Sequence, residues 1–97
     1  MNKALNMIGL ACRAGKIRSG AMLAEKAVKS KIAYLLIIAG DCSENTMDKF
    51  VSMAKFHEVS YVIFSDRASL GKFSGGGEKS VLAVLDAGFA EAIKKLL

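Results

Sequence analysis

The 97-residue sequence has no proline, only two cysteines and one histidine, and no long apolar run. Without proline, it cannot contain a proline-rich linker or ligand segment. The longest uninterrupted apolar run covers residues 32–39, eight positions, whereas a membrane-spanning helix needs about 20. We therefore expect no transmembrane segment and no membrane partner.

The beginning of the chain, residues 1–16, lacks the basic-then-apolar layout of a secretory signal peptide. In a chain that is not exported, Cys12 and Cys42 are most simply two reduced thiols. The expected location is therefore cytoplasmic.

Residue combinations that support catalysis or metal binding are also missing. There is no Cys-x-x-Cys pair and no carboxylate cluster at ligand spacing. Cys42 and His57 bracket a predicted helix, which separates them by roughly 20 Å at 1.5 Å per residue, too far for a nucleophile and its base. The stretch ending at Lys79-Ser80 has Phe73 and Glu78 where a nucleotide-binding P-loop needs glycine. We expect no catalytic residue, no metal, no cofactor and hence no enzyme.

What the sequence does contain is a globular composition, with 53% hydrophobic and 24% charged residues. Its length fits one domain, residues 1–97. Helix and strand patterns alternate along the chain, and the strands read as covered on both faces. This predicts an α/β fold, a single three-layer α/β/α sandwich with a central sheet of about four strands. The predicted elements are helices at 2–13, 20–30, between 43 and 57, 66–73 and 87–97, and strands at 16–19, 33–39, 59–64 and 81–85.

Several positions in these elements have a predicted local role. Leu23 is expected on the apolar side of the second helix and Leu96 on that of the last helix. Ser65 is expected to cap the fourth helix. Asp41, with Glu44 and Asp48, is expected to complement the dipole at the start of the third helix.

Positive charge is concentrated in the first third of the chain. Residues 1–31 contain seven basic residues and one acid, a net charge of +6, whereas residues 32–97 have a net charge of −1. Such a local positive field attracts polyanions. A solvated lysine-rich face would have the same composition, and it remains an alternative.

Two segments combine features of a phosphate-binding surface. Lys16 and Arg18 share one face of a predicted strand, which leads through Gly20 into a helix that carries Lys26. Farther along, three consecutive glycines, Gly75, Gly76 and Gly77, precede Lys79 and would let the backbone approach an extended ligand. A flexible surface loop is the alternative explanation of the glycines.

The ordered set of motifs resembles the kink-turn-binding ribosomal protein family of the seven-Ae and thirty-e type, in particular its small bacterial YlxQ-like branch. The resemblance covers nearly the whole chain. It rests on the opening segment 8–16 with Ser19-Gly20, on the segment 36–46, and on Leu70-Gly71 with Gly75. It implies a non-catalytic RNA-binding protein of a ribonucleoprotein, with structured RNA as partner, above all ribosomal RNA or the ribosome.

The family signature Gly-x-Asn-Glu-x-x-Lys is matched here only at its outer positions, Gly20 and Lys26, because Met22 and Leu23 replace the polar pair. In the family that pair hydrogen-bonds the edges of sheared G·A pairs, which Met and Leu cannot do. An alternative function is therefore a protein-interaction module on the same scaffold that has lost standard kink-turn recognition. The candidate RNA-binding residues are Lys16, Arg18, Gly20, Met22, Leu23, Lys26, Gly75, Gly76, Gly77 and Lys79.

Overall fold

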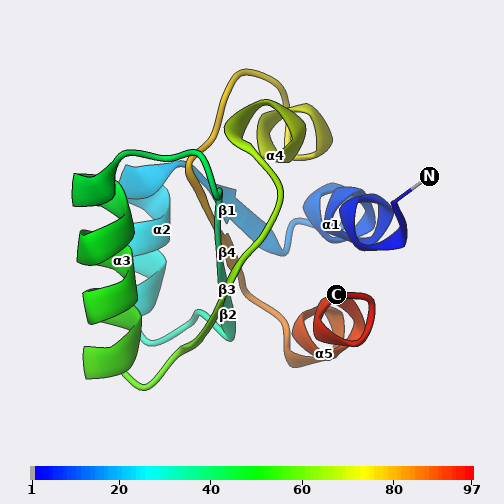
Figure 1. Ribbon diagram of the computed structural model, residues 1–97. Coiled ribbons are helices and arrows are strands. Elements are labelled where there is room, and N and C mark those ends of the chain that lie inside the picture. Colours follow the sequence, from blue (N-terminus) through cyan, green and yellow to red (C-terminus); the bar gives the residue numbers. More distant parts are fainter. Residues whose placement is uncertain (1) are drawn as a thin grey trace.

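The computed structural model describes residues 2–97 and contains five helices and four strands in alternating order (Figure 1). The helices and strands, in chain order, are α1 (Lys3–Arg13), β1 (Ile17–Ser19), α2 (Ala21–Lys29), β2 (Leu35–Ile38), α3 (Glu44–Phe56), β3 (Ser60–Ile63), α4 (Arg67–Phe73), β4 (Val81–Val84) and α5 (Ala87–Lys95).

The four strands form one mixed sheet in the order β1-β4-β2-β3. Strand β4 pairs antiparallel with β1 and with β2, whereas β2 and β3 are parallel. Helices α2 and α3 cover one face of the sheet, and α1, α4 and α5 cover the other (Figure 1). The predicted three-layer α/β/α sandwich with a four-stranded sheet is confirmed.

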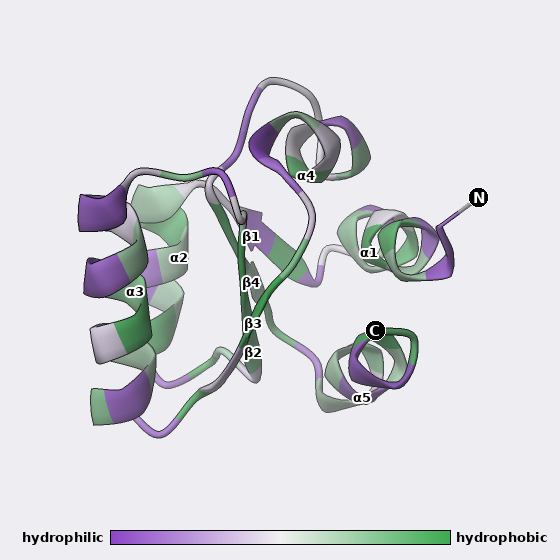
Figure 2. Cartoon of the chain, viewed as in Figure 1, coloured by the Kyte–Doolittle hydropathy of each residue, from purple (hydrophilic) through white to green (hydrophobic). Residues whose placement is uncertain are grey.

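Each face of the sheet builds its own apolar core, because successive strand residues point to opposite faces. Leu35 and Ile37 of β2 pack with the α1, α4 and α5 side. Leu36 and Ile38 pack instead with the α2 and α3 side, against residues such as Phe50. The helices accordingly turn their apolar residues toward the sheet and their polar residues outward (Figure 2).

Side-chain caps start four of the helices, as expected for short polar residues at these positions. Asn2 accepts a hydrogen bond from the Leu5 backbone N–H at 3.0 Å, and Ser43 accepts one from Thr46 at 3.1 Å. Asp86 caps α5 in the same way. After α1, Gly15 adopts the left-handed conformation, φ 75°, that is common just after a helix.

Three expectations about single residues are wrong. The cap of α4 is Asp66, because its carboxylate accepts from the Ser69 backbone N–H at 2.7 Å; Ser65 lies one residue earlier. Leu23 is 47% exposed and Leu96 is 38% exposed, so neither is in the core. Leu23 faces an open hollow along α2 that no other element fills, and Leu96 follows the last turn of α5.

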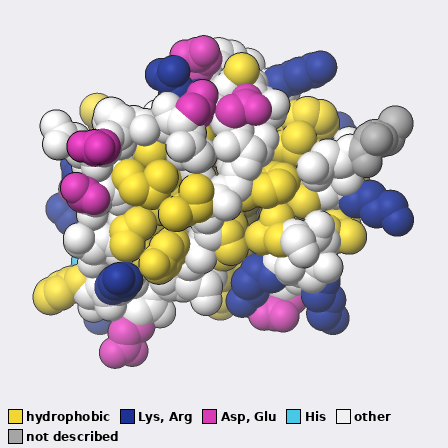
Figure 3. Space-filling model, in the orientation of Figure 1, with side chains coloured by type: hydrophobic (Ala, Val, Ile, Leu, Met, Phe, Trp, Pro, Cys, Tyr) yellow, Lys and Arg dark blue, Asp and Glu magenta, His cyan; other side chains and the backbone are white. Residues whose placement is uncertain are grey.

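Strand β3 also differs from expectation, because it is not covered like the central strands. It is an edge strand, and Ile63 in it is 54% exposed. Figure 3, with β3 toward the viewer, shows hydrophobic side chains exposed on this face. The apolar pattern of β3 did not reveal its position at the edge, which depends on strand order.

Candidate nucleic-acid interface

The connection from β1 to α2 depends on Gly20. This residue has φ 98° and ψ 156°, a conformation that side chains with a Cβ rarely adopt. Its N–H donates to the Val81 carbonyl oxygen at 2.9 Å, which ties the start of α2 to the beginning of β4. Gly20 itself offers no side-chain cap, so the first N–H groups of α2 have no partner from a capping side chain.

Two of the predicted cations, Arg18 and Lys26, are free of carboxylates. Within residues 2–97, neither lies within ion-pair distance of an acidic group. The nearby acid, Glu25, is occupied elsewhere: its oxygens lie 2.7 Å from Lys29 Nζ and 2.8 Å from Lys49 Nζ. The hydrogen bonds from Lys29 and Lys49 lower the pKa of Glu25 to about 2. Its charge is therefore engaged between α2 and α3 and does not compensate Arg18 on β1 or Lys26 on α2.

Arg18 and Lys26 meet at an open hollow between the edge strand β1 and α2. The hollow has a volume of about 160 Å³, and its remaining lining residues are Leu23, Ala27, Ser30 and Ile32. The Arg18 guanidinium is held against its own strand, with Nη1 3.4 Å from the Gly15 carbonyl oxygen and 3.3 Å from that of Ile17. The remaining guanidinium donors are available to a ligand.

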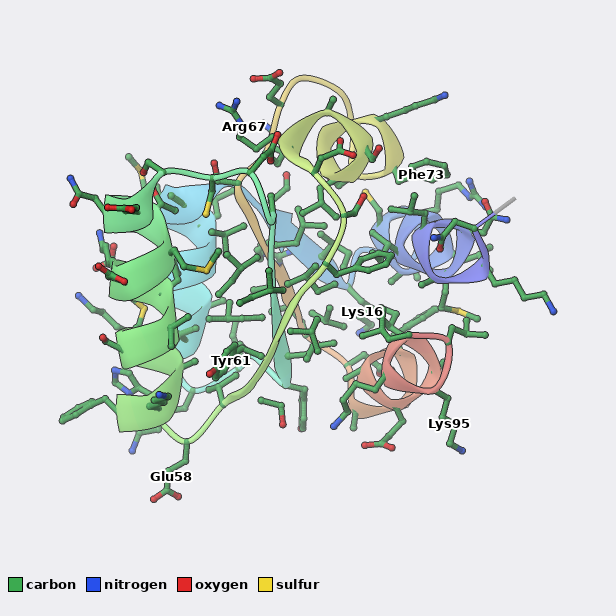
Figure 4. All side chains as sticks on the ribbon, viewed as in Figure 1. Lys16, Glu58, Tyr61, Arg67, Phe73 and Lys95 are labelled. Carbon is green, nitrogen blue, oxygen red and sulfur yellow. The ribbon has the colours of Figure 1, made fainter. Side chains whose placement is uncertain are left out.

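Lys16 is exposed but is not part of this hollow. It lies at the beginning of β1, toward the side of the sheet where α1 and α5 lie (Figure 4). Its carbonyl oxygen accepts from the Leu85 N–H at 2.8 Å, at the end of β4. Three residues of extended chain lie between it and Gly20, which places the two Cα atoms roughly 13 Å apart. The structure therefore brings together Arg18, Leu23 and Lys26, and leaves Lys16 at the other end of the strand.

The glycine loop packs directly on α4. Gly75, Gly76 and Gly77 all have positive φ values, 116°, 99° and 70°. The Gly76 N–H donates to the Gly71 carbonyl oxygen at 2.7 Å. A Cβ at Gly71 would lie 1.4 Å from the Gly77 carbonyl oxygen, so this helix position must be glycine for the loop to approach. The loop therefore has a defined backbone conformation, which its contacts with α4 stabilise.

This loop and the start of α2 lie at the same end of the sheet. The loop runs into β4 at Val81, the residue that binds the Gly20 N–H. Lys79 is two residues before Val81 and forms no ion pair in the described part of the chain. The exposed backbone of the loop and the start of α2 therefore lie next to each other on the surface of the protein.

Arg67, at the first position of α4, was not among the predicted site residues. Its Nε lies 3.5 Å from Asp41 Oδ2 and its Nη1 lies 3.8 Å from Glu78 Oε1 (Figure 4). Asp41 also accepts from the Arg67 backbone N–H at 2.8 Å. Asp41 therefore interacts with the start of α4, a contact that its predicted role at the start of α3 does not include. The contact spans 26 residues, so no local pattern could have indicated it.

Met22 and Leu23 are both at the surface. Met22 is 83% exposed, and Leu23 borders the hollow. An exposed methionine at the start of a helix offers flexible apolar area without hydrogen-bonding capacity. The two positions where the family pattern has its polar pair are thus accessible to a ligand, but in this chain they carry apolar side chains.

The cysteines and acids do not assemble into a reactive centre. Burial raises the pKa of the Cys42 thiol above its usual value, which disfavours the nucleophilic thiolate. Residues 2–97 contain no group of three or more histidine, cysteine or acidic side chains placed to hold a metal ion. Every helix between residues 2 and 97 is too short or too polar to span a lipid bilayer.

Comparison with known proteins gives matches over nearly the full chain. The model of the family described as "Ribosomal protein L7Ae/L30e/S12e/Gadd45 family" matches residues 2–94. A relative from Enterococcus faecium named RNA-binding protein YlxQ is 35% identical over 95 residues, which cover 98% of this chain and 91% of the relative. The Bacillus subtilis (strain 168) protein of the same name is 36% identical over 91 residues, which cover 94% and 91%.

Solved structures show the same architecture. A protein of unknown function from Bacillus halodurans C superposes with a TM-score of 0.94 at 29% identity, covering 99% of this chain and 97% of that one. The Giardia lamblia 15.5kD RNA binding protein superposes with a TM-score of 0.81 at 23% identity, covering 95% and 82%. The second likeness concerns the fold alone.

Proposed function

This chain belongs to the ribosomal protein L7Ae/L30e/S12e/Gadd45 family, and we propose that it binds structured RNA without catalysing a reaction. The proposed face consists of the β1–α2 connection, the exposed side of α2 and the loop from Gly75 to Lys79. Relatives about 35% identical are named RNA-binding proteins, which supports the proposal. We further propose that the RNA is ribosomal, that binding occurs on or near the ribosome, and that the protein acts in the cytoplasm.

The observation that carries the proposal is the pair Arg18 and Lys26, two cations without carboxylate partners beside a helix start. Cations of this kind bind phosphate oxygens and release counterions from the RNA. The unpartnered N–H groups at the start of α2 and the glycine backbone add hydrogen-bond donors for phosphates. Such contacts fix the position of an RNA, whereas its shape and its unstacked nucleotides determine which RNA fits.

The salt dependence of binding tests this proposal. Affinity for a structured RNA should fall steeply between roughly 50 and 200 mM salt. Lys26→Ala should flatten the plot of log affinity against log salt by about one unit, because one phosphate contact is lost. Lys95→Ala is the matched control, since Lys95 is an exposed cation in the last turn of α5, outside the proposed face; its slope should stay unchanged. Affinity that does not respond to salt would refute an electrostatic RNA interface.

Arg18→Ala and Lys16→Ala separate the two parts of the basic strand. Arg18 borders the hollow and is expected to behave like Lys26. Lys16 lies about 13 Å from Gly20, so its effect on the slope reports how far the bound RNA extends along β1. If Arg18→Ala left the slope of log affinity against log salt unchanged, β1 would not be part of the interface.

A protein-interaction module on the same scaffold is the second candidate, and the exposure of Met22 supports it. At 83% exposure, Met22 leaves apolar area in water at the position where the family pattern has a polar residue. This candidate predicts that Met22→Ser leaves RNA affinity unchanged and abolishes capture of a protein partner. RNA affinity that falls with Lys26→Ala but not with Met22→Ser would assign the two residues to different partners.

A further inference from the structure

The hollow between β1 and α2 is lined by apolar and cationic side chains. Leu23 and Ile32 are 47% and 46% exposed, so nearly half of each side chain faces solvent there. Arg18 and Lys26 also line the hollow, and neither has a carboxylate partner among residues 2–97. Ser30, which ends α2, adds a hydroxyl group to the lining.

This combination fits a ligand with a flat apolar body and an adjacent negative charge. A base with its own phosphate has both features, and both cations complement the phosphate. The volume of about 160 Å³ is close to that of an apolar cavity of about 150 Å³ that binds benzene, so one six-membered ring fits. Ser30 can donate to or accept from a polar edge of that ring. A base stacked within a duplex could not enter, because its faces are already covered.

We infer that the hollow receives the base of one unpaired nucleotide in the bound RNA, with Arg18 and Lys26 on its phosphate. The inference rests on the proposed RNA binding and adds a subsite to it. Leu23 and Ile32 contact the two faces or the edge of the ring and exclude water from it. The hollow therefore selects RNAs that present an unstacked base next to the helix bound by α2.

Three hairpin RNAs of equal length test the subsite. One has a single bulged uridine, the second has an abasic residue at the bulge, and the third is fully paired. The first two have the same phosphates, so their comparison isolates the base from the electrostatic contribution. At one fixed salt concentration, the wild-type protein should bind the uridine hairpin about fivefold more tightly than the abasic one, at the low end for base contacts.

The variant Ile32→Ser should reduce that ratio to nearly one and leave affinity for the paired hairpin unchanged. Ile63→Ser is the matched control, because Ile63 is similarly exposed, at 54%, but lies on β3 at the opposite edge of the sheet. Ile63→Ser should keep the wild-type ratio. Both substitutions replace half-exposed side chains, and matching melting temperatures would verify that the fold is retained.

Methyl resonances provide a second readout that does not depend on affinity. Ring currents of an inserted base should shift the methyl signals of Leu23 and Ile32 with the uridine hairpin, and not with the abasic one. Equal binding of the uridine and abasic hairpins, without these shifts, would overturn the subsite while RNA binding itself stands. Failure to bind any of the three hairpins would overturn the proposed function and the subsite together.

Discussion

Replacement of Gly71 by alanine tests whether the glycine loop is held against α4. Gly71 is buried in the middle of α4, and an added Cβ would lie 1.4 Å from the Gly77 carbonyl oxygen and 2.5 Å from its carbonyl carbon. These are backbone atoms, so no side-chain rotation can relieve the overlap. Either α4 shifts or the loop moves away and loses the 2.7 Å hydrogen bond from the Gly76 N–H to the Gly71 oxygen.

Gly9 provides the matched control, because it is also a buried helix glycine. A Cβ at Gly9 would meet nothing closer than Phe73 Cδ1 at 3.6 Å, an ordinary contact. Alanine favours a helix over glycine by about 1 kcal/mol at both sites. Overpacking costs about 1–3 kcal/mol, occasionally more, and a contact this short with backbone belongs at the upper end. We expect Gly71→Ala to lower the free energy of unfolding by roughly 2 kcal/mol and Gly9→Ala to raise it slightly.

Thermal unfolding followed by circular dichroism measures the difference. About 4–8 °C per kcal/mol applies to a domain of this size, so Gly71→Ala should lower Tm by roughly 8–16 °C while Gly9→Ala raises it by a few degrees. A Gly71→Ala protein as stable as the wild type would show that the loop can move away from α4 without lowering the free energy of unfolding. The loop would then have no defined conformation of its own.

Three further predictions concern charge, thiol and base recognition. The lowered pKa of Glu25 means that its ion pairs stabilise the fold above about pH 4.5 and are lost as the pH falls toward 2. Glu25→Gln, which lacks this carboxylate, should therefore lose less Tm than the wild type does across that range. An equal loss of Tm in the two proteins would contradict this role of Glu25. Since the pKa of Cys42 is raised, this thiol should react with iodoacetamide more slowly at pH 8 than free cysteine does, and Cys42→Ser should change RNA affinity by less than about threefold. A standard kink-turn should be bound with little preference over a duplex, because each unpaired polar group at a base edge costs about 1–3 kcal/mol. Met22→Asn with Leu23→Glu should raise that preference, and a wild-type ratio already above about a hundred would refute the importance of the missing pair.

The secondary structure and the architecture could be predicted from the sequence because their signals are local. The apolar run at residues 33–39 contains β2, with Leu35 to Ile38 buried on both faces, and alternation of helices and strands leads to three layers. Asn2, Ser43 and Asp86 act as caps because a short polar side chain reaches an N–H group three residues ahead. Gly15 and Gly20 have the positive φ values that only glycine adopts easily.

Several parts of the candidate site depend on contacts between distant residues. The strand order leaves β1 and β3 at the edges, which exposes Ile63 and opens the hollow beside Arg18. Periodicity indicates which residues share a side of a helix, but it does not indicate whether another element covers that side. The expected core position of Leu23 is therefore wrong, because Leu23 borders an open hollow that Ile32 also lines.

The sequence by itself determined the elements, the caps at Asn2 and Asp86 and the concentration of basic residues at 1–31, because each depends on residues within a few positions of one another. Only the tertiary structure decided which charges remain free. Within α2, Glu25 can reach Lys29 one turn farther on but not its neighbour Lys26, and the packing of α2 against α3 brings Lys49 to it as well. Whether an acidic group from another element faces Arg18 or Lys26 is decided by the tertiary arrangement alone, since ion pairing depends on distance in space and not on distance along the chain.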